Sequence, residues 1–167
     1  LHNAKGLGSL KRIWSFTLDQ LSKGNDPNFT HRKEHLAELG QCELDYCYAN
    51  TVLLRCKSSH FDKNGILYKI YILLEDFYTI SKDKDIPLVD AVRYSIFNGD
   101  VHIRCTCPDF LYRGYAYEGT TLNYLYGLPR EKRPPVKNNP RLISTTCKHC
   151  ERANDWWINN TDTITSL

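Results

Sequence analysis

Four cysteines and one histidine, residues of the types that bind zinc, lie in two short segments of this 167-residue chain. The first segment, RCTCPDFLYR, contains a Cys-x-Cys pair, and the second, TTCKHCER, contains Cys-x-His overlapping with Cys-x-x-Cys. Zn²⁺ builds tetrahedral structural sites from thiolate sulfur and imidazole nitrogen, and each close pair supplies two such ligands. The two segments together therefore predict one structural zinc site. Its candidate ligands are Cys105, Cys107, Cys147, His149 and Cys150.

The residues themselves leave the fourth ligand open. Cys105, Cys107 and Cys147 supply three thiolates, and either His149 or Cys150 can complete the tetrahedron, because zinc also accepts the Cys-x-x-Cys spacing. Two other interpretations stand beside the zinc site. The thiols could be buried as small apolar groups, or they could form disulfides between the two segments, which would need an oxidising compartment.

The elements that must position these segments are predicted from the spacing of apolar residues. Apolar residues recur at helical spacing over 8–22, and a second helix is predicted from a cap at Thr30 to Gly40. The period then changes to two over the segments ELDYCYA, TVLLRCK and ILYKIYILL, which predicts a small antiparallel sheet. Residues 79–90 are polar and are predicted to be a connector.

The second half of the chain is predicted to contain a ββα unit. Residues 91–105 alternate around an Asn-Gly turn signal, which predicts a β-hairpin that ends on the first cysteine. Pro108 breaks the second strand, so that both cysteines of the first pair can turn toward one metal. A Pro-rich loop over 127–141 precedes a final helix, which Ser144 or Thr145 would cap.

The pattern Cys-Thr-Cys at 105–107, followed by Cys-Lys-His at 147–149, resembles that of the SWIM-type zinc finger. The resemblance covers less than half of the chain. It implies a ββα unit that holds one zinc ion, with His149 rather than Cys150 as the fourth ligand. The sequence departs from the family in the length of the gap between the pairs, residues 108–146, and we interpret the excess as an insertion.

These predictions describe an α+β fold with N-terminal helices, a small antiparallel sheet and a zinc-stapled ββα unit that carries a long insert. Residues 1–90 are predicted to form the helical segment with the sheet, and residues 91–167 the SWIM-like unit. The length of the chain fits one compact domain that contains both.

Composition and charge exclude several classes of protein. No run of roughly 18 apolar residues is present, which excludes a helical membrane span, and the first residues lack the apolar run of a signal peptide. The net charge of +3 is too small to indicate a nucleic-acid-binding protein by itself. We therefore expect synthesis in a reducing, intracellular compartment, where paired cysteines favour a metal over a disulfide.

The sequence contains no pattern that indicates catalysis. Zinc deaminases also use Cys-x-x-Cys, but they need a His-x-Glu triplet, which does not occur here. Gly-rich phosphate loops and a nucleophile elbow are also missing. With four protein ligands, the zinc would leave no position for a reacting water, so a structural ion in a non-enzymatic protein is expected.

Two classes of function remain. The first is a structural or interaction protein of a larger assembly, with other proteins or copies of itself as partners and no membrane. The segments CTCPDFLYR and CKH also resemble virion proteins of tailed bacteriophages, and a chain without methionine that begins at Leu1 suits a processed particle component. The second class is a nucleic-acid-binding module that contacts DNA or RNA through the basic, tyrosine-rich insert 110–152. Its predicted contacts are Arg130, Lys132, Arg133, Lys137 and Arg141.

Overall fold

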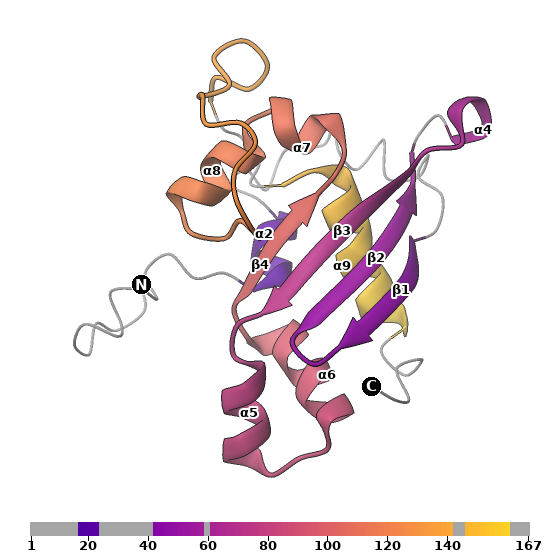
Figure 1. The fold of residues 1–167 in the computed structure, drawn as a ribbon, viewed down its shortest axis with the longest axis vertical. Coiled ribbons are helices and arrows are strands. Elements are labelled where there is room, and N and C mark those ends of the chain that lie inside the picture. Colours follow the sequence, from indigo (N-terminus) through magenta and orange to yellow (C-terminus); the bar gives the residue numbers. More distant parts are fainter. Residues whose placement is uncertain (1–16, 24–41, 59–60, 142–145, 161–167) are drawn as a thin grey trace.

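The computed structural model describes residues 17–23, 42–58, 61–141 and 146–160. Four strands form one antiparallel sheet in the order β1-β2-β3-β4, and α2 and α9 lie behind it in Figure 1. The strands are β1 (Cys42–Tyr48), β2 (Thr51–Lys57), β3 (Leu67–Leu74) and β4 (Val101–Cys105). The helices are α2 (Leu18–Lys23), α4 (Phe61–Asn64), α5 (Phe77–Lys84), α6 (Leu88–Asn98), α7 (Pro108–Tyr112), α8 (Tyr115–Thr121) and α9 (Lys148–Asn160). The predicted α+β class is confirmed.

The core of the protein lies between the sheet and α9. Alternate residues of the central strands point to this side, as a strand with one buried face requires. In β3 these residues are Ile70, Ile72 and Leu74, which are fully buried. Ala153 and Trp157, four residues apart on α9, are also fully buried and lie on the helix face that contacts the sheet. The helical spacing predicted for this last element is confirmed.

β2 and β3 follow the predicted alternation, whereas the pairing of β1 shifts between Leu44 and Tyr46, and Tyr46 and Tyr48 are exposed. Leu54 of β2 lies opposite Ile70 of β3, so the buried residues of neighbouring strands meet on one face. Cys42 and Cys56 lie opposite each other in β1 and β2 and are joined by a disulfide. The spacing of these two cysteines in the sequence does not predict the bridge, which depends on the register of the two strands.

The predicted hairpin over 91–105 is wrong in its first half. Residues 91–98 belong to α6, and the Asn-Gly pair ends this helix, with the Gly99 N–H donating to the carbonyl of Ser95 at 2.8 Å. The second strand is confirmed as β4, but it pairs with β3, where Cys105 lies opposite Ile70. The apparent alternation failed as a signal because Tyr94 is 41% exposed, whereas the buried positions of α6 follow helical spacing.

One other region differs from the predictions, and several predicted elements fall outside the described residues. The predicted connector at 79–90 contains most of α5 and the start of α6. Of the predicted N-terminal helices, only α2 falls among the described residues, where Leu18 and Leu21 are fully buried. The predicted helix from Thr30 to Gly40 and the cap at Ser144 or Thr145 lie outside the described residues.

The chain after α8 runs along the outer edge of β4. The N–H of Ile103 donates to the carbonyl of Tyr124 at 2.8 Å, and the N–H of Tyr126 donates to the carbonyl of Ile103 at 2.9 Å. Residues 127–141 then form a loop without helices or strands, as predicted, which extends to the top of Figure 1. Among the described helices, none is both long enough and apolar enough to cross a membrane.

Candidate metal centre

Cys105, Cys107, Cys147 and His149 lie together in one buried cluster. One ligand atom from each residue falls within 4.8 Å of the corresponding atoms of all the others. The most exposed of the four side chains, that of Cys105, is only 4% exposed. The predicted meeting of the Cys-x-Cys and Cys-x-His segments is therefore confirmed as a buried cluster that could hold one metal ion such as zinc.

The end of β4 positions the first pair of cysteines. Cys105 is the last residue of β4, and side chains two residues apart along an extended chain point to the same side. Thr106 continues the pairing with β3, because its N–H donates to the carbonyl of Lys69 at 3.0 Å. The Lys69 N–H in turn donates to Oγ1 of Thr106 at 2.9 Å. These two hydrogen bonds hold Thr106, the residue between Cys105 and Cys107, against β3.

The start of α7 fixes the second cysteine of this pair. Cys107 is the N-cap residue of α7, and its Sγ accepts a hydrogen bond from the N–H of Phe110 at 3.3 Å. Pro108 follows at the start of the helix, where the missing N–H costs nothing and the fixed φ suits the first turn. The predicted break of the strand at Pro108 is thus also the beginning of a short helix.

The start of α9 positions Cys147 and His149. The carbonyl of Cys147 accepts hydrogen bonds from the N–H groups of Cys150 and Glu151, at 3.1 and 3.3 Å, so the first helical turn closes directly after the thiol. The ring of His149 packs edge-on against Tyr68 of β3, with ring centroids 4.8 Å apart. Both ring nitrogens of His149 are buried, and neither has a hydrogen-bond partner. Because buried polar atoms normally have a partner, a metal ion bound to one nitrogen fits this site.

Cys150 lies beside this cluster but outside the group of four. Its Sγ is 3.7 Å from the Sγ of Cys147, and its side chain is fully buried. The set of mutually close ligand atoms contains His149 and not Cys150. The geometry thus favours His149 as the fourth ligand, and the assignment stays a prediction that metal content can test.

Hydrogen bonds connect the thiols of the cluster. Burial raises the pKa of Cys105 well above its ordinary value. Burial also acts to raise the pKa of Cys147, but hydrogen bonds with the neighbouring thiols of Cys105, Cys107 and Cys150 outweigh it, so the pKa of Cys147 lies well below its ordinary value. Among these thiols, that of Cys147 loses its proton most readily. A divalent cation would displace the remaining protons and bind the thiolates directly.

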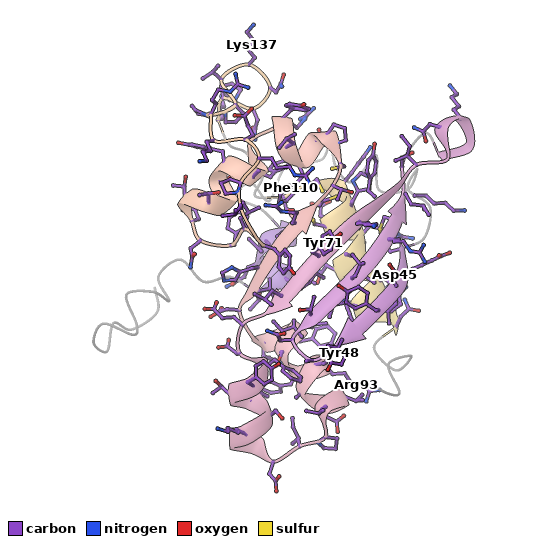
Figure 2. All side chains as sticks on the ribbon, viewed as in Figure 1. Asp45, Tyr48, Tyr71, Arg93, Phe110 and Lys137 are labelled. Atoms are coloured by element: carbon purple, nitrogen blue, oxygen red, sulfur yellow. A yellow bond between two sulfur atoms is a disulfide. The ribbon has the colours of Figure 1, made fainter. Side chains whose placement is uncertain are left out.

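The structure places the five predicted nucleic-acid contacts in different surroundings. Arg133 is paired with Glu131, with the Nη2 and Oε2 atoms 2.7 Å apart, and Lys137 extends from the far end of the loop (Figure 2). Arg130 lines a cavity that it shares with Arg104, a residue that the sequence analysis did not select. The alternation of β4 could have indicated Arg104, because it places this side chain on the face of the sheet opposite Cys105.

Lys132 and Arg141 are exposed. Comparisons with protein-family models, with curated proteins and with solved structures found no match to this chain. The likeness to the SWIM-type zinc finger therefore rests on the pattern of the four buried residues of the cluster alone.

Proposed function

We propose that this chain is a non-enzymatic structural protein in which one Zn²⁺ joins the sheet to α9. The single observation that carries the proposal is the buried group of four ligand atoms within 4.8 Å of one another. Three thiols and one imidazole match the donor set of closed structural zinc sites, and four protein ligands leave no position for a reacting water. The proposed ligands are Cys105, Cys107, Cys147 and His149.

The proposed metal would crosslink parts of the chain that are distant in sequence. Cys105 and Cys107 follow β4, whereas Cys147 and His149 begin α9, and residues 108–146 lie between them. Closing this segment and docking α9 costs conformational entropy. Zinc binding in small structural domains contributes on the order of 10 kcal/mol, which offsets such a cost.

The metal content of the purified full-length chain tests this proposal. We expect about one zinc per chain, and loss of that zinc in Cys107→Ser. Cys47→Ser is the matched control, because Cys47 lies on β1 outside the cluster and burial raises its pKa to about 11, which keeps the thiol protonated. A wild-type chain without zinc after purification under reducing conditions would contradict the proposal, and so would undiminished zinc in Cys107→Ser.

We also propose that this protein works within a larger protein assembly, such as the virion of a tailed bacteriophage. Support comes from β1, which is the first strand of the sheet and exposes 45% of Tyr46 and 75% of Tyr48 (Figure 2). Edge strands with exposed aromatic side chains are suited to pairing with another chain. Light scattering should therefore detect self-association or association with a neighbouring protein. A compact monomer that binds DNA tightly would contradict this role.

One observation favours a second candidate function, a nucleic-acid-binding module. Arg130, one of the predicted contacts, lines the same cavity as Arg104, Tyr71 and Tyr126. Cations beside aromatic rings bind the phosphates and bases of single-stranded nucleic acids.

A further inference from the structure

A cavity of about 230 Å³ lies beside the metal centre. Cys105 and Cys107 contribute to its wall, but Cys147 and His149 do not line it, so it is distinct from the space that the four proposed ligands enclose. Its other walls come from the sheet, from α7 and from the loop after Tyr126; Figure 2 labels Tyr71 on the sheet and Phe110 on α7. The cavity therefore needs a separate explanation.

Two guanidinium groups meet in this cavity without a counter-charge. The described residues offer no carboxylate within ion-pair distance of Arg104 or Arg130. Burial, and next the nearby charge of Arg130, lower the pKa of Arg104, as expected for two cations that line one cavity. An arginine stays charged under all ordinary conditions, so an anion bound between the two groups would relieve the repulsion.

The loop holds Arg104 in a fixed position. Its guanidinium donates a hydrogen bond to the carbonyl of Leu128. The preceding residue, Gly127, has a φ of +78°, a conformation that glycine adopts without strain and that turns the loop around the guanidinium. One edge of the Arg104 side chain is thus occupied, and its remaining N–H groups are available to a ligand.

Aromatic rings stand directly beside these charges. Tyr71 is the cross-strand partner of Arg104, and its ring stacks on that of Tyr126 with centroids 5.6 Å apart and an angle of 10° between the planes. Both rings are half-buried and line the cavity, so the pair presents a flat aromatic surface to a bound molecule. A planar ring that carries a phosphate would satisfy the charges and the aromatic surface together.

We propose that this cavity binds one nucleotide unit, with the phosphate between Arg104 and Arg130 and the base against the stacked Tyr71 and Tyr126. The volume of about 230 Å³ lies below the roughly 300–1,000 Å³ of typical pockets for small ligands, so the cavity would enclose no more than one nucleotide unit. A zinc ion with three thiolates and a neutral imidazole carries one net negative charge, which balances only one of the two guanidinium groups. This inference rests on the second candidate function and not on the assembly role.

The unit could come from a free mononucleotide or from a single-stranded nucleic acid, and two binding experiments separate these sources. The probes are thymidine 5′-monophosphate and a labelled oligothymidylate about ten nucleotides long, each added to the zinc-loaded full-length chain at about 50 mM salt. We expect Arg130→Ala to weaken binding by about tenfold or more, because a charge-assisted hydrogen bond to the phosphate is lost. Lys137→Ala is the matched control, since it removes one cation from the same loop outside the cavity.

Further comparisons separate the two parts of the ligand. Tyr126→Leu should weaken binding of the nucleotide by about tenfold while leaving inorganic phosphate unaffected, since base stacking contributes about 1–3 kcal/mol per base. Zinc content is measured for every variant, so a variant that fails to fold is recognised.

Three results would overturn the proposal: no binding of either probe to the wild-type chain, equal weakening by Arg130→Ala and Lys137→Ala, or binding of inorganic phosphate as tight as that of the nucleotide. The first also removes binding of single-stranded DNA as a function of this chain. The second result would mean that nucleic acid binds along the whole basic loop and not in this cavity.

Discussion

The imidazole of His149 is a buried ring whose two nitrogens have no hydrogen-bond partner, and one edge of it is occupied by Tyr68. A buried polar atom without a partner costs about 1–3 kcal/mol. The ring would therefore destabilise the fold unless something else binds it. A zinc ion accepts the lone pair of one nitrogen and so removes half of this cost, which is why we expect His149 to be a ligand.

The choice between His149 and Cys150 can be tested with two variants. His149→Ala removes one of four ligands, roughly a quarter of the 10 kcal/mol or more that such sites contribute, so we expect zinc affinity to fall about a hundredfold. Cys150→Ser should keep close to the full zinc content, because the Cys150 thiol lies outside the set of mutually close ligand atoms. Competition with a coloured chelator measures both affinities. The opposite ranking would assign the fourth position to Cys150.

At the scale of elements, the first ligand pair depends on how β4 ends. Thr106 lies between the two cysteines, and its backbone and side chain both bond to Lys69 of β3. The chain is thus attached to the sheet at Thr106, and these hydrogen bonds also restrict the positions of the Cys105 and Cys107 thiols on either side. Preorganised ligands bind a metal more tightly because less freedom is lost on binding.

Substitution of Thr106 tests this contribution. Thr106→Val keeps the shape of the side chain but removes the oxygen that accepts the Lys69 N–H, so we expect a loss of about 0.5–1.5 kcal/mol in the free energy of unfolding. Thr106→Ser keeps the acceptor and serves as the control. Urea unfolding of the zinc-loaded proteins gives both values. Equal stability of the valine and serine variants would show that the hydrogen bond does not contribute.

The elements also show where prediction from the sequence works and where it fails. α9 was predictable because Ala153 and Trp157 repeat at helical spacing, and β3 because Ile70, Ile72 and Leu74 recur at every second position. α6 was not predictable, because a short apolar run fits a strand and a helix equally well. Only the packing of the run in the folded protein determines which of the two it forms. The Cys42–Cys56 bridge depends on strand register, which cysteine spacing does not encode.

The metal centre and the cavity also differ in how far the sequence predicts them. Close ligand pairs with zinc-type spacing carry their own signal, so the members of the buried cluster could be identified before their positions were known. The meeting of Arg104 and Arg130 could not, since the two residues are brought together by a loop that runs beside β4. Local patterns thus predicted the metal centre, whereas the cavity is a product of the tertiary fold.

At the scale of the whole molecule, the proposed zinc holds α9 against the sheet at the end where β4 stops. α9 contacts all four strands, so its docking completes the core. We expect removal of zinc by a chelator to lower the thermal midpoint by about 10 °C or more, since each kcal/mol corresponds to about 2–4 °C in a chain of this size. Circular dichroism measures the shift, and added zinc should reverse it.

Cys107→Ser provides the control for this experiment. Because this variant is expected to lack zinc, the chelator should leave its thermal midpoint unchanged. A wild-type midpoint that does not respond to the chelator, in a sample shown to have lost its zinc, would mean that the metal contributes nothing to the stability of the fold.

The most direct test of the metal centre is X-ray absorption at the zinc edge of the purified full-length protein. The account predicts one zinc with three sulfur neighbours at about 2.3 Å and one nitrogen neighbour at about 2.0–2.1 Å. A shell of four sulfur atoms would replace His149 by Cys150, and a shell that contains water oxygen would contradict a closed structural site. Absence of zinc from the protein would contradict the central claim itself.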